Sequence, residues 1–213
     1  MGARSRSPRE GCGGLRELEI DTRAGRLRVF VNECTYPPSD DSELAVEALA
    51  VLREEGRSYS SIIDLGSGSG VLALAAYKIF RPRIIAAVEA HRCPAVSSRL
   101  SLPSHLLVAI CPSASCLKSV FDLAIVNPPY LPERPPRGDE CGEVLARSWA
   151  GEGVMEGMLG AAAGLAREVL AVYSSLSPIG VPEFFRRLGF SFRVLASRRF
   201  FMESVEVGHA WRG

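Results

Sequence analysis

The sequence predicts one α/β domain built on a mostly parallel, seven-stranded sheet with helices on both faces. Short apolar runs alternate with helical patterns from Ser61 to Val207, which is typical of a parallel sheet. A glycine-rich turn joins the first apolar run to the helix after it, as at many ligand sites in such sheets. A chain of 213 residues with 47% hydrophobic residues can bury a full core. We therefore expect a single domain over residues 15–213.

The segment before the sheet is predicted to contain a tail, a hairpin and a helix. Residues 1–14 are rich in Arg, Gly and Ser, which predicts a disordered tail. Arg16–Ile20 and Arg26–Val31 alternate apolar with polar residues around a group of turn formers, and this pattern predicts a small hairpin. Ser39 or Asp40 can cap the helix that follows.

The remaining residues supply the sheet and its covering helices. The predicted strands are Ser61–Leu65, Arg83–Glu89, Leu106–Ile110, Phe121–Val126, Ala171–Ser175, Phe190–Ser197 and Phe200–Val207, and the predicted helices are Val71–Phe80, Pro94–Leu100, Val154–Leu170 and Pro182–Leu188. A long stretch rich in Pro and Gly, from Asn127 to Gly153, joins the fourth strand to the next helix. Connections of this length are usually functional loops.

Composition excludes several classes of protein. The net charge of +1 gives no broad basic surface for nucleic acid. The six cysteines and three histidines lack the spacing of a zinc site, so we expect no metal, and their irregular spacing favours free thiols in a reducing cytosol. Neither a signal core nor an apolar run of about 20 residues is present. We expect a cytoplasmic protein.

The first predicted strand leads into the glycine-rich turn. Its sequence from Ile62 is Ile-Ile-Asp-Leu-Gly-Ser-Gly-Ser-Gly, which places Asp64 near the strand end. Glycines allow a sharp turn and close approach to a ligand, and the next helix offers N–H groups to an anion. The spacing differs from the dinucleotide and P-loop patterns. A ligand that carries both an ammonium and a carboxylate fits, and the methionine part of S-adenosylmethionine is such a ligand.

A second acidic residue ends the next predicted strand. Glu89 lies 25 positions after Asp64, and a carboxylate there can accept both hydroxyl protons of a ribose. The alternative interpretation is a simple glycine turn beside a solvated glutamate. Because acids stand at the ends of both strands, we favour a cofactor site.

Asn127, Pro128, Pro129 and Tyr130 directly follow the fourth predicted strand, where an open sheet places its ligand crevice. An amide nitrogen is a poor nucleophile because its lone pair is delocalised into the carbonyl. The Asn127 side-chain oxygen and the Pro128 carbonyl can each accept one N–H of a substrate NH₂, and the Tyr130 ring can pack on the flat group. This predicts transfer of a methyl group to a planar nitrogen, held in line by these acceptors. The alternative is a stiff loop with a capping asparagine.

Taken together, the Asp-Leu-Gly-Ser-Gly-Ser-Gly and Asn-Pro-Pro-Tyr motifs resemble class I (Rossmann-like) methyltransferases of the HemK/PrmC type, which methylate the N5 nitrogen of a protein glutamine. Thr35–Ser42 and Arg147–Gly157 are similar to the short archaeal and eukaryotic branch of this family. The similarity extends from about Val29 to Val207.

The resemblance implies an activity and a set of site residues. The family methylates the glutamine of the Gly-Gly-Gln loop of class I peptide-chain release factors, and S-adenosylmethionine becomes S-adenosylhomocysteine. The catalytic positions would be Asn127, Pro128 and Tyr130, and the substrate-binding positions would be these three and Pro129. The cofactor-binding positions would be Ser42, Asp64, Gly66, Ser67, Gly68, Gly70, Glu89 and Asn127. The family usually has an acid after the third strand to bind the adenine, whereas this chain has Cys111-Pro112-Ser113. Backbone groups or Ser113 would take that role here.

Eukaryotic relatives bind a small zinc-binding activator protein at the sheet edge formed by the third strand. Here that strand is Leu106–Ile110. It is either an exposed edge that a partner covers or an ordinary strand with two buried faces. Other functions also remain open: an adenine-N6 or guanine-N2 nucleic-acid methyltransferase, a protein lysine methyltransferase, or a non-catalytic subunit that binds S-adenosylmethionine.

Overall fold

The computed structural model describes residues 12–112, 116–118, 120–130, 141 and 152–213. The chain begins with the predicted hairpin, in which β1 (Arg16–Thr22) pairs antiparallel with β2 (Gly25–Val31). Most of the predicted tail lies outside the described residues. Cys12, however, is only 2% exposed and forms a disulfide with Cys93. The predicted tail therefore extends too far along the chain.

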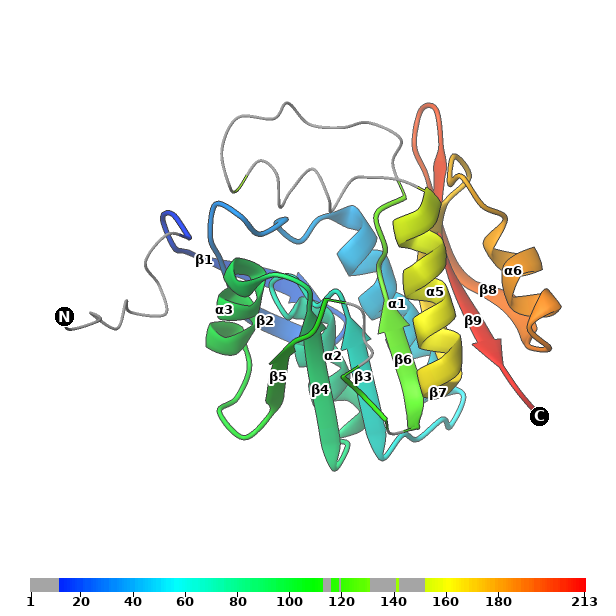
Figure 1. The fold of residues 1–213 in the computed structure, drawn as a ribbon, viewed down its shortest axis with the longest axis horizontal. Helices are drawn as coiled ribbons and strands as arrows, with labels where there is room; N and C mark the ends of the chain where they lie inside the picture. The colour runs from blue at the N-terminus through cyan, green and yellow to red at the C-terminus, as the bar shows by residue number, and fades with distance from the viewer. Residues whose placement is uncertain (1–11, 113–115, 119, 131–140, 142–151) are drawn as a thin grey trace.

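The sheet has seven strands in the order β5-β4-β3-β6-β7-β9-β8 (Figure 1). All neighbours from β5 to β7 are parallel, and β9 is antiparallel to both of its neighbours. The prediction of a mostly parallel, seven-stranded sheet is thus confirmed. Its strands are β3 (Ser61–Leu65), β4 (Ile84–Glu89), β5 (Leu107–Ile110), β6 (Phe121–Val126), β7 (Ala166–Ser174), β8 (Ser191–Arg199) and β9 (Ser204–Trp211).

Helices cover the two faces of this sheet and produce two apolar cores. The helices are α1 (Asp40–Glu54), α2 (Val71–Phe80), α3 (Arg92–Ser101), α5 (Glu152–Leu165) and α6 (Val181–Arg187). Side chains of α1 and α2 pack with β2 on one face, and those of α5 and α6 on the other. Successive strand residues such as Ile62 and Ile63 enter opposite cores, because side chains alternate across a strand. This is why the central strands are apolar throughout.

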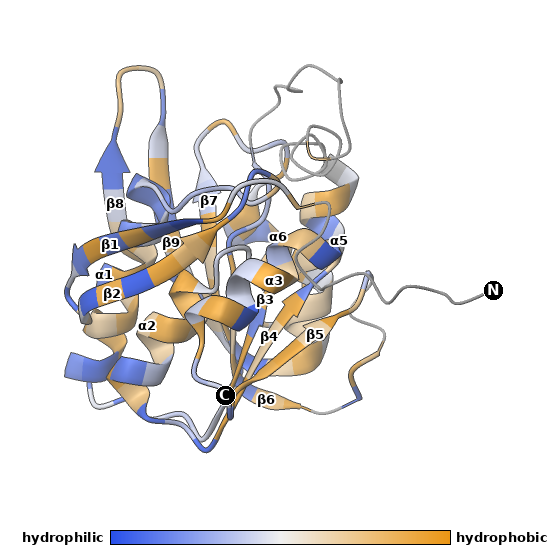
Figure 2. Cartoon of the chain, turned by 90° about the vertical axis from the view of Figure 1, so that its left-hand side faces the viewer, coloured by the Kyte–Doolittle hydropathy of each residue, from blue (hydrophilic) through white to orange (hydrophobic). Residues whose placement is uncertain are grey.

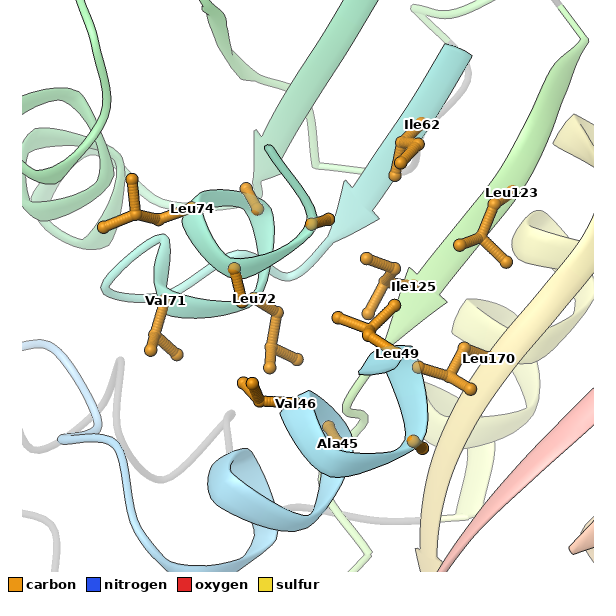
Figure 3. Close-up of a cluster of buried hydrophobic side chains, with 14 of the residues drawn as sticks. Ala45, Val46, Leu49, Ile62, Val71, Leu72, Leu74, Leu123, Ile125 and Leu170 are labelled. Carbon is orange, nitrogen blue, oxygen red and sulfur yellow. The ribbon is translucent and has the colours of Figure 1, made fainter. Parts of the chain in front are cut away.

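Figure 3 shows the core beneath α1. Leu49 of α1 lies beside Ile125 of β6 and Leu170 of β7, and Val46 lies near Leu72 of α2. The start of α1 is therefore held above the ends of the central strands, which matters for the site described below.

Two predicted boundaries near the end of the chain are wrong. Ala166–Leu170 was expected to be helical, yet β7 begins at Ala166 and pairs with Phe121 of β6. The local helical pattern is outweighed by two tertiary effects: this segment pairs with strands on both sides, and Val169 and Leu170 are buried. The last strand also begins later than expected, because Phe200 to Glu203 form the turn between β8 and β9.

The expectation of free thiols is also wrong. The six cysteines form three disulfides, Cys12–Cys93, Cys34–Cys141 and Cys111–Cys116. Irregular spacing in the sequence did not reveal these pairs, since the partners are brought together by the tertiary fold. Within the described residues, no cluster of three or more His, Cys, Asp or Glu side chains could hold a metal ion. None of the helices seen in these ranges has the length and apolar character needed to span a membrane.

Candidate functional site

The glycine-rich turn and the Asn-Pro-Pro-Tyr turn lie side by side. Strands β3 and β6 are parallel neighbours, and their last paired residues are Leu65 and Val126. Gly66 and Asn127 directly follow this pair, so the two turns leave the sheet together at its carboxyl edge. An open α/β sheet binds its ligands at this edge.

The glycine-rich turn has the backbone shape that only glycine adopts easily. Gly66, Gly68 and Gly70 have φ values of 74°, 54° and 79°, in the left-handed region that side chains disfavour. A Cβ at Gly68 would meet no atom within 4 Å, so this position faces open space. The turn can therefore approach a ligand closely.

The N–H groups of this turn are largely used within the protein. The Val88 carbonyl accepts from Gly66 and Ser67 at 2.8 and 3.1 Å, and the Ser67 carbonyl accepts from Gly70 at 2.7 Å. The Ser67 hydroxyl is bonded to that of Ser98 at 2.8 Å. These groups of the turn therefore do not point freely at a ligand. The turn contributes space and shape more than hydrogen-bond donors.

Asp64 is buried at the end of β3. One of its carboxylate oxygens accepts the Ala73 N–H of α2 at 3.0 Å. Burial raises the pKa of Asp64 to about 7, the hydrogen bond from Ala73 opposes this rise, and the Glu89 charge adds to it. An ammonium group nearby would favour the ionised form.

Glu89 is the second buried carboxylate at this edge. It accepts hydrogen bonds from the N–H groups of Gly68 and Ala90, and it is only 7% exposed. Burial raises its pKa to about 7 despite these bonds. The structure thus places the Glu89 carboxylate, which was predicted to bind the ribose, directly against the glycine-rich turn.

Asn127 and Tyr130 meet at a residue that the sequence reasoning missed. The Asn127 amide donates to Asp41 Oδ2 at 2.9 Å, and the Tyr130 hydroxyl donates to the same oxygen at 3.2 Å. Burial, followed by the Asp41 charge, raises the pKa of Tyr130. Within the described residues no donor contacts Asn127 Oδ1. As far as the described residues go, that oxygen can accept a hydrogen bond from a substrate.

Asp41 lies in the first turn of α1 and is 5% exposed. Its Oδ1 accepts the Ser42 N–H at 2.7 Å and the Ser39 hydroxyl at 2.7 Å. An acid in a first helical turn is usually explained by the helix dipole, so the residue type and position of Asp41 alone do not indicate a functional role. The one available sign was its position inside the Thr35–Ser42 segment.

Ser42 lies on the same turn of α1 and is buried. It lines a pocket of about 220 Å³ between β1, the start of α1 and Val71, the first residue of α2. Neither Glu89 nor Asn127 lines this pocket. Through Val71 it adjoins the end of the glycine-rich turn, and it does not contain the groups from which we derive the chemistry.

The region proposed to bind adenine is only partly described. The Cys111 N–H donates to the Glu89 carbonyl at 2.6 Å, and Cys111 is bonded to Cys116. Ser113, the side chain offered as a substitute for the missing acid, lies outside the described residues.

The strand expected at the sheet edge is indeed the edge strand. β5 is the first strand in the sheet order, and Figure 2 shows its hydrophobic colouring at the border of the sheet. Leu107 and Ile110 are 52% and 55% exposed. The interpretation of β5 as an ordinary strand with two buried faces is therefore wrong.

Comparisons with known proteins agree with this arrangement. No protein-family model matches the chain. A curated release factor glutamine methyltransferase from Bradyrhizobium diazoefficiens is 32% identical over 111 residues, which are 48% of this chain and 37% of that protein. The chain thus spans well under half of the length of this relative.

One similar solved structure is the Mtq2–Trm112 complex of E. cuniculi, which is responsible for methylation of the termination factor eRF1. Its TM-score is 0.60 at 17% identity, and the match covers 84% of this chain and 99% of that chain. A protein from Pyrococcus horikoshii, suggested to be an RNA methyltransferase, also gives 0.60, at 18% identity over 84% and 92% of the two chains. These structural likenesses establish the fold. The chain has the class I, Rossmann-like methyltransferase fold, and its predicted resemblance to the HemK/PrmC-type glutamine methyltransferases is confirmed over about half of its length.

Proposed function

We propose that this chain transfers a methyl group from S-adenosylmethionine to the glutamine side chain in the Gly-Gly-Gln loop of a class I peptide-chain release factor. The observation that carries the proposal is the pairing of Leu65 with Val126, which sets the glycine-rich turn beside Asn127 and Pro128. The similarity to release factor glutamine methyltransferases supports the choice of substrate.

The residues at the carboxyl edge fit this cofactor. Glu89 offers a buried carboxylate for the ribose hydroxyls, and Asp64 offers a second negative charge on the side of an ammonium group. Gly68 leaves open space beside Glu89. When bound, S-adenosylmethionine supplies an electrophilic methyl group on a sulfonium and leaves as S-adenosylhomocysteine.

The chain's own contribution is to position the nitrogen that receives the methyl group. Asn127 Oδ1 and the Pro128 carbonyl each accept one N–H of the glutamine amide, which fixes the amide plane so that the nitrogen lone pair, perpendicular to that plane, faces the methyl group. Both oxygens stabilise the positive charge that develops on nitrogen. The nitrogen loses one proton to water, because neither a carboxamide nor a peptide carbonyl is a useful base. Tyr130 packs against the flat amide.

The surface beside the site suits a protein substrate better than a polyanion. Phe201 and Met202, in the turn between β8 and β9, are 100% and 77% exposed. Ser174 pairs with Val205, so this turn projects from the same edge of the sheet as the two functional turns (Figure 1). An exposed apolar tip is typical of protein docking surfaces, and the net charge of +1 gives no general attraction for nucleic acid.

A partner protein belongs to the same proposal. The E. cuniculi relative was solved as a two-protein complex. In this chain Leu107 and Ile110 are exposed on β5, the edge strand of the sheet, which a small activator protein would cover. Zinc binding by such an activator remains an expectation from the family resemblance.

The test is a methyl-transfer assay with labelled S-adenosylmethionine. Substrates are the class I release factor, its Gln→Asn loop variant, tRNA, rRNA and DNA, each with and without a candidate activator. Label in the wild-type release factor alone, located on glutamine by mass spectrometry, is the expected result. Label in nucleic acid or on lysine would replace the proposed substrate with one of the alternatives. Binding of S-adenosylhomocysteine without transfer to any substrate would identify a non-catalytic subunit.

A further inference from the structure

The Asn127 carboxamide can work in only one of its two orientations. Its oxygen and its NH₂ group occupy nearly the same space, so rotation by half a turn exchanges an acceptor for a donor. If the NH₂ end faced the substrate, it would meet the N–H groups of the glutamine amide, donor against donor. Whatever holds the NH₂ end away from the substrate therefore decides whether the site is competent.

Asp41 is the group that contacts the NH₂ end. A carboxylate has only acceptors, and the partners of Asp41 among the described residues all donate to it: Asn127 and Tyr130 reach Oδ2, and Ser39 and Ser42 reach Oδ1. Asn127 can bond to such a group through its NH₂ end alone. With Asp41 in α1 and Asn127 after β6, this contact spans 86 positions of the chain.

We propose that Asp41 is a positioning residue that fixes the Asn127 amide with Oδ1 toward the substrate nitrogen. This inference rests on the proposed function, because it assigns how the acceptor for the glutamine N–H is oriented. Asp41 itself is turned toward Asn127 by the Ser42 N–H and the Ser39 hydroxyl, both at 2.7 Å.

Asp41→Asn tests this directly because it keeps the shape and changes one acceptor into a donor. The Ser42 N–H lies 2.7 Å from Oδ1 and also donates to the Ser39 carbonyl at 3.0 Å. An NH₂ group in place of Oδ1 would meet this N–H donor against donor, so the new NH₂ group faces Asn127. The Tyr130 hydroxyl can accept one of its protons, but Asn127 avoids a donor-to-donor contact with it by turning its oxygen inward, which presents NH₂ to the substrate. Loss of one such contact to a developing charge typically costs about 10²–10³-fold in turnover. We expect kcat to fall about 100-fold, with the KM for S-adenosylmethionine within about threefold of wild type.

A swap of the two side chains provides the decisive variant. In Asp41→Asn combined with Asn127→Asp, the new amide at 41 can donate to the carboxylate at 127 and still accept from Ser42. The second oxygen at 127 then faces the substrate. We expect this double variant to regain at least about tenfold of the turnover lost in Asp41→Asn. Asp40→Asn, at the exposed neighbouring position, is the matched control and should keep wild-type turnover. Thermal unfolding of each variant establishes that it is folded.

Two results would overturn the inference: Asp41→Asn within threefold of wild-type turnover, or a double variant no more active than Asp41→Asn. A wild-type chain that transfers no methyl group to the release factor would instead refute the proposed function. The orientation of Asn127 is then judged without activity, by NMR exchange of its side-chain NH₂ protons. Asp41→Asn should accelerate that exchange at least about tenfold, whereas equal rates in wild type, Asp41→Asn and Asp40→Asn would refute the role of Asp41.

Discussion

Binding of the cofactor should depend on pH because Glu89 must be ionised to accept both ribose hydroxyls. Burial raises the pKa of Glu89 to about 7 in the free protein, so much of it is protonated at neutral pH. Binding favours the ionised form and therefore releases a proton. By linkage, affinity rises with pH until the group is fully ionised in the free protein.

The magnitude follows from the ionised fraction. With a pKa of about 7, about one tenth of Glu89 is ionised at pH 6 and about nine tenths at pH 8. Affinity should therefore increase about tenfold over this range, equivalent to about 1.4 kcal/mol. The pKa of Asp64 is also raised to about 7 by burial. If its ionised form is required too, the two effects multiply to about 100-fold.

Calorimetric titration with S-adenosylhomocysteine at pH 6, 7 and 8 measures this dependence, since neither the amino-acid group nor the adenine of that ligand changes charge in this range. Glu89→Gln cannot titrate, so the increase in affinity between pH 6 and pH 8 should be about tenfold smaller in this variant than in wild type. The same comparison with Asp64→Asn measures how much of the increase comes from ionisation of Asp64. Affinity that is flat in wild type, or that rises as the pH falls, would refute the placement of the ribose at Glu89.

Three further predictions follow from the site, the sheet edge and the disulfides. Asn127→Ala should lower kcat at least about 100-fold and leave the affinity for S-adenosylhomocysteine within a few fold; a fully active variant would show that the chemistry lies elsewhere. Leu107→Asp combined with Ile110→Asp should abolish co-purification with the activator while the thermal midpoint of the isolated chain changes little, because both side chains are already half exposed; retained binding would exclude β5 as the interface. The Cys34–Cys141 disulfide closes a loop of 107 positions, so replacing both cysteines with serine should lower the free energy of unfolding by up to about 4–5 kcal/mol. Urea unfolding of this double variant and of the wild type, both without reductant, measures the difference, and thiol labelling of Cys34 or Cys141 in the untreated wild type would contradict the prediction.

Much of the fold could be predicted from the sequence because its strongest signals are local. The bounds of Phe121–Val126 match the prediction, since five of its six residues are apolar and Asn127 is followed by two prolines that cannot continue a ladder. Ser61–Leu65 was equally clear because the glycine-rich turn ends it. The boundary between α5 and β7 was not predictable in this way. Ala166–Leu170 has a helical pattern, and only its pairing with β6 and β9 makes it a strand.

In the candidate site, too, the residues with local sequence signals could be predicted, whereas those that depend on tertiary contacts could not. The glycine-rich turn, Glu89 and Asn127 were found because each stands at the end of a predicted strand, where parallel topology requires them to meet. Asp41 was missed because its role depends on which strand end lies beneath the start of α1. Disulfides were missed for a related reason, since Cys34 and Cys141 are joined across 107 positions and sequence spacing carries no information on such a contact.

The position of α1 explains why a helix outside the sheet shapes the chemistry at its edge. Its apolar face packs on Ile125 and Leu170 (Figure 3), which fixes its height above the strand ends. Its exposed side is tied to β8, since Arg198 pairs with Asp40 at 2.8 Å and with Glu47 at 3.1 Å. A helix that is packed on one side and ion-paired on the other can shift only at a cost in free energy. The Asp41 carboxylate therefore has a fixed position relative to Asn127. The packing of the core beneath α1 thereby determines the orientation of the Asn127 amide.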